Sequence, residues 1–177
     1  MDATSRRYAN ALFQATPPGD LDAVLGDLES IGAALQDPTA QLAITDPEIP
    51  RSVRRKACAK LSDGLQPMVQ RFVQVLLERR RERILLTVAP AFRALVLEAR
   101  GEVEGVVETA KPLGPAAVEA LATKAGAKIG KKVLLQVVEK PELIGGVRMR
   151  IGNTLFDSSV ATAIDQLEQR LMAAPIP

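Results

Sequence analysis

The hydrophobic periodicity of the chain changes near Gly101, and this change constrains the fold more than any other feature. Before Gly101, apolar side chains recur at the three- and four-residue spacing of amphipathic helices. After it, residues 102–109 alternate between apolar or small side chains and mostly charged ones, which is typical of a strand with one solvated face. We therefore expect an α+β protein with an all-helical domain at 1–101 and a smaller mixed α/β domain at 102–177.

The first half carries the apolar stripes of about six helices. Aspartates at 20 and 37 are placed to cap two of them, and Pro38 suits a first helical turn. Pro90 should kink the last helix or mark its true start. The predicted helices cover residues 5–15, 21–35, 38–44, 53–61, 67–77 and 84–99.

The second half alternates between strand and helix patterns. A helix should follow Pro115 and stop near Gly130, and Gly152-Asn153 should form a hairpin turn between two short strands. Residues 133–138 are predicted to be a buried strand. We expect a final helix that begins at Asp157 or Ser158 and carries Val160, Ile164, Leu167 and Leu171.

The composition argues against catalysis. The 177 residues include no histidine and a single cysteine, which removes histidine acid–base chemistry, zinc clusters and internal disulfides. Cys58 lies in a helical pattern, where a small core residue is the favoured interpretation. The sequence therefore predicts neither an enzyme nor a cofactor or metal site.

Charge is distributed unevenly along the chain. Residues 1–50 hold two basic and eight acidic side chains, whereas residues 51–100 hold twelve and four. Such a bias on consecutive helices indicates faces that meet each other or a partner. No uncharged apolar run is long enough to span a bilayer, and the first residues lack the pattern of a signal peptide, so we expect an intracellular, unprocessed protein.

Two motifs suggest phosphate or nucleic-acid binding on first reading. The glycines of residues 126–132 are one position too close for a phosphate-binding loop, and a strand follows the loop instead of preceding it. The arginine run at 79–83 is interleaved with acidic residues and has no aromatic residue for base stacking. We do not expect nucleotide binding at either place, and nucleic acid stays a minor alternative.

Two long motifs carry a resemblance to a known family. Residues 6–13 read RRYANALF, and residues 141–152 read PELIGGVRMRIG, followed by DSSV at 157–160. Both are similar, in order and spacing, to signatures of the delta subunit of bacterial F-type ATP synthases, the oligomycin sensitivity conferral protein family. The chain departs from the family pattern at Leu86, where a proline is common, and at Ser158, where a glycine is usual.

The resemblance implies a non-catalytic stator subunit. In that family, a six-helix amino-terminal domain binds the amino-terminal helices of the alpha subunits at the top of the catalytic head, and the carboxy-terminal domain joins the peripheral stalk of b subunits. The head then resists rotor torque during proton-driven ATP synthesis. One copy per complex is implied, on the cytoplasmic face of the bacterial inner membrane, with only indirect contact with the membrane.

The candidate partner-binding residues follow from this resemblance and from the helical patterns. The first helix has an alanine-rich stripe, and the helix at 67–77 is apolar over more than one face. The alpha-binding candidates are Tyr8, Ala11, Leu12, Ala15, Phe72, Val75, Leu76 and Arg79, and the stalk-binding candidates are Leu143, Ile144, Val147 and Phe156.

Two other classes of function stay open. One is a free-standing interaction module whose groove takes another amphipathic helix. The other is an RNA- or phosphate-binding protein that uses residues 79–83, whose binding would weaken steeply with salt.

Overall fold

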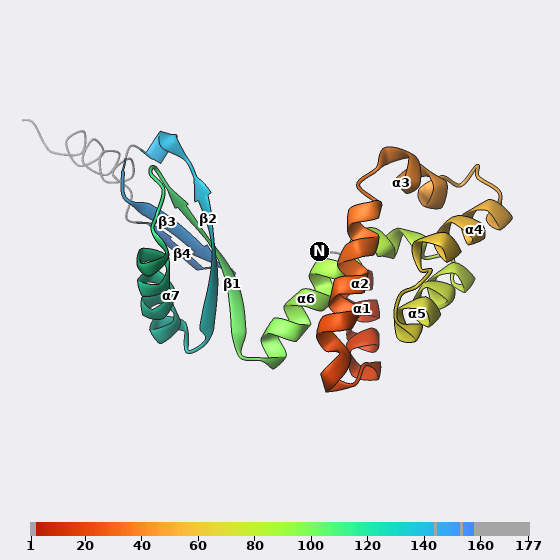
Figure 1. Ribbon diagram of the computed structural model, residues 1–177, viewed down its shortest axis with the longest axis horizontal. Helices are drawn as coiled ribbons and strands as arrows, with labels where there is room; N and C mark the ends of the chain where they lie inside the picture. The colour runs from red at the N-terminus through yellow and green to blue at the C-terminus, as the bar shows by residue number, and fades with distance from the viewer. Residues whose placement is uncertain (1–2, 144, 153, 158–177) are drawn as a thin grey trace, which may run out of the picture. The chain divides into compact units, whose positions relative to one another are not determined.

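The computed structural model describes residues 3–143, 145–152 and 154–157 (Figure 1). One compact unit ends at Val96 and a second begins at Leu97, so the division falls inside the last helix of the first half. The first unit is helical and the second combines a helix with a sheet, which confirms the α+β class. The helix predicted to follow Ser158 lies outside the described residues.

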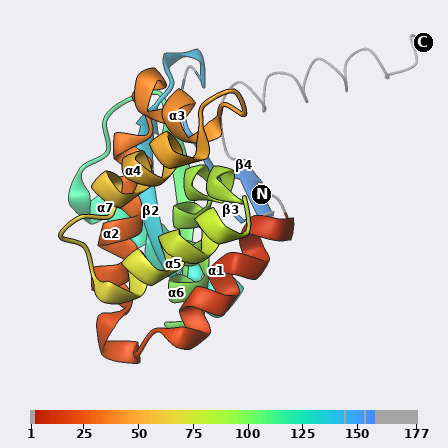
Figure 2. The same cartoon turned by 90° about the vertical axis from the view of Figure 1, so that its right-hand side faces the viewer.

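Six α-helices and two short 3₁₀ turns make up the first half of the chain. In order these are α1 (Ala3–Ala15), η1 (Pro18–Asp20), α2 (Leu21–Ala34), α3 (Pro38–Thr45), α4 (Arg51–Leu61), α5 (Pro67–Glu78), η2 (Glu82–Leu86) and α6 (Val88–Ala99). Helix α5 lies between α1 and α4 (Figures 1 and 2). Its position between two helices explains why its apolar side chains cover more than one face.

A single apolar cluster holds these helices together. Phe92 of α6 is fully buried, and its ring meets the ring of Phe13 from α1 edge to face at 6.0 Å. Leu28 and Ile31 of α2 and Leu76 of α5 are also almost completely buried. Each such side chain contributes about 2 kcal/mol through burial, so the packed stripes, rather than helix propensity, hold the bundle together.

The sixth helix begins later than its apolar pattern suggests. Residues 84–86 belong to the 3₁₀ turn η2, and α6 starts at Val88. Pro90 therefore stands in the first turn of α6, where its missing N–H is not needed. The prediction that Pro90 marks the true start of this helix is confirmed.

The second unit is a four-stranded sheet with the strand order β2-β1-β3-β4. Its elements are β1 (Glu102–Thr109), α7 (Pro115–Ile129), β2 (Lys132–Glu139), η3 (Pro141–Leu143), β3 (Val147–Ile151) and β4 (Thr154–Asp157). Strands β1 and β2 are parallel and joined through α7, while β3 runs antiparallel to both β1 and β4. Gly130 is left-handed, with φ of 71°, and ends α7 as predicted.

Helix α7 covers one face of this sheet. Val107, Met149 and Ile151 of the sheet pack there with Ala125 of α7 in a second apolar cluster. The prediction that residues 133–138 form a buried strand is wrong in one respect. They form β2 at the edge of the sheet, and Leu134, Val137 and Val138 are exposed. Leu134 and Val138 lie on the face opposite α7, and β1 is the only described strand that pairs with β2.

Candidate functional site

The first helix divides its predicted binding residues between the core and the surface. Leu12 is 3% exposed and lies in the core beside Ala9. Ala11 and Ala15 are exposed, and Tyr8 is half-buried. The alanine-rich stripe is therefore an outer face of α1, and we remove Leu12 from the candidate binding residues because a core side chain has no area to offer a partner.

The fifth helix divides its candidates in the same way. Leu76 is fully buried in the core, whereas Val75 is 44% exposed and Arg79 is exposed. Phe72 is only 8% exposed. Leu76 is therefore a structural residue of the bundle, and we remove it from the candidates as well.

The remaining candidates come together where α1 meets α5. The rings of Tyr8 and Phe72 pack edge to face, with their centroids 6.5 Å apart. Tyr8 shares one side of α1 with Ala11 and Ala15, and Phe72 shares one side of α5 with Val75 and Arg79, at the same helical spacing. We call this set the α1–α5 surface; it consists of Tyr8, Ala11, Ala15, Phe72, Val75 and Arg79.

The stalk-binding candidates lie largely on the covered side of the sheet. Leu143 is 4% exposed, and Val147 and Phe156 pack against the cluster beneath α7. The ammonium group of Lys128 lies 5.6 Å from the centre of the Phe156 ring and covers part of it. Ile144 lies outside the described residues. Leu143, Val147 and Phe156 help to stabilise the second unit and leave little apolar area for a partner.

The opposite face of the sheet holds exposed apolar side chains that the sequence analysis missed. Leu134, Val138 and Leu155 are 37%, 41% and 58% exposed. The pairing register places them on one face with Val106, opposite the face that packs against α7. We call the apolar set Val106, Leu134, Val138 and Leu155, with the charged side chains among them, the open sheet face.

A charged network crosses the open sheet face. The carboxylate of Glu108 lies 2.6 Å from the Lys140 ammonium and 3.9 Å from the Arg148 guanidinium, and Arg148 also pairs with Asp157 at 2.9 Å. The hydrogen bond from Lys140 holds the pKa of Glu108 below its ordinary value. A cavity of about 490 Å³ lies over this network between Val106 and Leu155. The face therefore combines apolar contact area with fixed charges, as protein interfaces do.

The β2 pattern explains why this face was missed. Residues 133–138 are apolar at five of six positions, which is typical of a strand covered on both faces. Within β2, Gln136 was a signal of this face, because a polar residue in such a run indicates a solvated side.

The arginine run at 79–83 has structural roles in the turn after α5. Arg80 has φ of 55°, and the Arg81 N–H donates to the Leu76 carbonyl at 2.8 Å, which closes the end of the helix. Arg83 donates to the Thr45 carbonyl at 3.2 Å. Glu82 is buried and lies 3.7 Å from Arg54. Within this turn, Arg83 therefore has a structural role through its side chain, and Arg80 and Arg81 through their backbone.

The described residues contain no cluster of three side chains suited to hold a metal ion. Burial raises the pKa of the Cys58 thiol to about 11, with a further upward contribution from Glu82, so the thiol stays protonated and unreactive. No helix within the described ranges is long and apolar enough to cross a membrane.

Comparison with known proteins gives one consistent family. The family model described as "ATP synthase delta (OSCP) subunit" matches residues 4–171. A protein of Symbiobacterium thermophilum named ATP synthase subunit delta is 38% identical, over 97% of this chain and 94% of its own length. One of the same name from Halalkalibacterium halodurans is 32% identical, over 98% of this chain and 97% of its own.

A solved structure shares the fold. A chain in the structure of the Toxoplasma gondii mitochondrial ATP synthase hexamer superimposes with a TM-score of 0.70, at 24% identity. The match covers 99% of this chain and 100% of that chain.

Proposed function

The chain belongs to the ATP synthase delta (OSCP) subunit family, and from this premise we propose that its two surfaces hold the two ends of a stator connection. As a member of this family it is a non-catalytic stator subunit of the ATP synthase complex. The α1–α5 surface binds the amino-terminal helices of the alpha subunits, and the open sheet face binds the peripheral stalk of b subunits.

Exposure of Val75 beside the Tyr8–Phe72 contact is the observation that carries the alpha-subunit assignment. Val75 is a large apolar side chain left 44% exposed on a helix whose other apolar residues are packed. Ala11 and Ala15 have small side chains, so a helix laid along α1 could approach its backbone closely. Recognition of an amphipathic helix by such a surface depends on apolar anchors at three- and four-residue spacing.

The apolar set on the open sheet face supports the stalk assignment. Leu134, Val138 and Leu155 are exposed on the same face that carries the network of Glu108 and Arg148. A stalk helix lying on this face would bury the apolar residues and fix its register against the charges. The proposal thus moves the stalk-binding site from Leu143, Val147 and Phe156 to the other side of the sheet.

The mechanical role follows from torque balance. Proton flow turns the rotor, and a catalytic head that was not held would turn with it and make no ATP. To hold the head, the subunit needs tight contacts with the head at one end and with the stalk at the other, and it needs no catalytic chemistry at either end. Gly101, which has φ of 67° between α6 and β1, is a natural joint between the two binding units. We place one copy in each complex, on the cytoplasmic face of the bacterial inner membrane.

Calorimetric titration of the full chain with a peptide from the amino terminus of the cognate alpha subunit tests this proposal. We expect one-to-one binding that is retained when the salt concentration is raised, because the α1–α5 surface is mainly apolar. Binding that disappears at high salt would favour a charged site, and absence of binding at either salt would contradict the alpha-subunit assignment. A truncation after Gly101 should bind the peptide equally well.

A further inference from the structure

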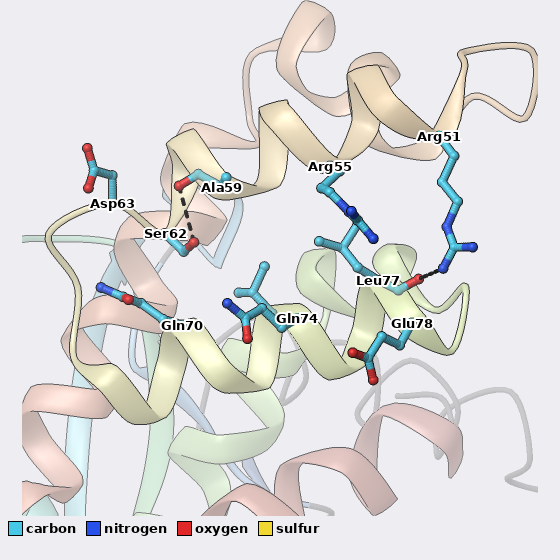
Figure 3. A pocket seen from close by; sticks show the side chains of 10 residues that line it. Arg51, Arg55, Ala59, Ser62, Asp63, Gln70, Gln74, Leu77 and Glu78 are labelled. Atoms are coloured by element: carbon cyan, nitrogen blue, oxygen red, sulfur yellow. Dashed lines mark hydrogen bonds between the residues drawn. The ribbon is translucent and has the colours of Figure 1, made fainter.

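A second groove lies between α4 and α5, apart from the α1–α5 surface. It has a volume of about 440 Å³ (Figure 3). Its apolar lining consists of Ala59, which is exposed, and of Val73 and Leu77, which are 2% and 8% exposed. Helical spacing puts Val73 and Leu77 on the side of α5 opposite Val75 and Arg79. Two partners could therefore bind to α5 at the same time, one on each side.

The two walls of this groove differ in charge. Arg51 and Arg55, four residues apart, project from α4, while Gln70 and Gln74, also four apart, project from α5 (Figure 3). Helix α4 carries no acidic residue over its whole length from Arg51 to Leu61. Asp63 and Glu78 stand at opposite ends of the groove, each at or just beyond the end of a helix. The α4 wall therefore carries two cations, Arg51 and Arg55, and the α5 wall is neutral over the middle of the groove.

The basic wall lacks acidic partners among the described residues. Within the described residues, the guanidinium of Arg55 makes no ion pair or hydrogen bond, and that of Arg51 makes only a long contact of 3.5 Å with the Leu77 carbonyl. By contrast, Arg54, on the inner side of the same helix, is paired with Glu82. Charge complementarity thus assigns a negatively charged occupant to the wall that Arg51 and Arg55 form.

We propose that the α4–α5 groove binds a second helix of a partner subunit, one that presents two carboxylates about one turn apart. Carboxylates four residues apart are separated by about 6 Å along the helix axis, which matches the step from Arg51 to Arg55. Small apolar side chains of the helix would meet Ala59, and its polar side chains would hydrogen-bond the amides of Gln70 and Gln74. The proposal rests on the proposed function in one respect: the partner is another subunit of the ATP synthase complex.

Photocrosslinking in the purified, assembled ATP synthase tests this site. One variant of the full chain carries benzoylphenylalanine in place of Ala59, on the α4 side of the groove, and a second carries it in place of Val75, on the α1–α5 surface. We expect Ala59 to crosslink to a helical segment with acidic residues four positions apart. A crosslink from Val75 alone would overturn the groove proposal and leave the proposed function intact. The absence of a crosslink from either position would contradict both the groove proposal and the proposed function.

Charge reversal gives the matched control. Arg51→Glu/Arg55→Glu should lower the crosslink yield at Ala59 by about tenfold. Lys56→Glu/Lys60→Glu makes the same change in charge at the same spacing on α4, but neither lysine lines the groove, so the yield should stay near the unmodified value. Equal losses in both variants, or crosslinking only to lipid or to a segment without acidic residues, would overturn the proposal. Replacing the two carboxylates of the crosslinked segment by lysine should restore the yield with Arg51→Glu/Arg55→Glu.

Discussion

The carboxylate of Glu82 lies 3.7 Å from the guanidinium of Arg54, and the Glu82 side chain is only 5% exposed. This contact joins the turn after α5 to the inner side of α4. A buried carboxylate without its cation costs far more free energy than the intact pair contributes. Arg54→Met should therefore lower the free energy of unfolding by about 3 kcal/mol, measured by urea denaturation.

A double variant of Arg54 and Glu82 shows how much of this loss comes from the unpaired charge and how much from lost packing. Arg54→Met/Glu82→Gln removes both charges, so it should recover part of the stability lost in Arg54→Met alone. A double variant less stable than the single one would contradict the assignment of the loss to an unpaired buried charge.

Cys58, near the same pair, should make stability depend on alkaline pH. Its thiol has a pKa raised from 9.0 to about 11, because burial and the charge of Glu82 disfavour the thiolate. The unfolded chain ionises first, so the stabilising contribution is present in full below pH 9 and is lost as pH rises toward about 11. Relative to Cys58→Ala, the wild-type chain should lose on the order of 1 kcal/mol over this range in urea denaturation. Parallel curves for the two proteins would show that the thiol does not titrate differently on folding.

Gly105 is predicted to be essential for packing within the sheet. A Cβ atom there would lie 2.7 Å from Cγ1 of Ile151 and 3.2 Å from the Arg150 carbonyl oxygen. Gly105→Ala should destabilise the second unit by about 1–3 kcal/mol in thermal denaturation, since the neighbouring strand cannot move freely. Gly114→Ala is the control, because nothing lies within 4 Å of its added Cβ atom. Similar melting temperatures for the two variants would contradict the close approach at Gly105.

Local sequence signals predicted aspartate caps correctly only where the preceding backbone also had the conformation that a cap needs. Asp37 accepts hydrogen bonds from the N–H groups of Thr39 and Ala40 and caps α3 as predicted. Asp20 makes no such bond, because the 3₁₀ turn η1 runs directly into α2 and Asp20 belongs to that turn. A cap depends on the backbone before the helix, which the residue type alone does not specify.

The candidate binding residues were harder to predict than the fold. A stripe of apolar residues on a helix does not show which members face the core, and Leu76 and Val75 are neighbours with opposite environments. The same ambiguity hid the open sheet face, since the apolar run of β2 suits either a central or an edge strand. Which helical residues face the core, and which face of the sheet is open, both depend on contacts between segments far apart in the chain.

Val75→Asp should remove binding of the alpha-subunit peptide without unfolding the protein. Val75 is 44% exposed, so a carboxylate there stays hydrated but disrupts an apolar contact. We expect affinity at least about tenfold weaker in calorimetry, with unchanged far-UV circular dichroism. Val53→Asp is the control, since Val53 is 48% exposed on α4, away from the α1–α5 surface. Leu76→Asp, by contrast, should unfold the helical unit, because Leu76 is fully buried.

Val138→Gln should weaken binding of the b-subunit stalk, and Val137→Gln should not. These two valines are neighbours in β2 with nearly equal exposure, 41% and 39%, but they lie on opposite faces. Glutamine is already present at Gln136 in the same strand, so both variants should fold equally well. Val138 pairs with Glu108 and belongs to the open sheet face, whereas Val137 pairs with Val107 on the face that α7 covers.

For Val138→Gln alone, we expect a loss of about tenfold in affinity for the carboxy-terminal part of the b subunit, measured by surface plasmon resonance. Equal loss in both variants would point to the exposed edge of β2 as the binding site, and loss in Val137→Gln alone would return the site to the α7 side of the sheet.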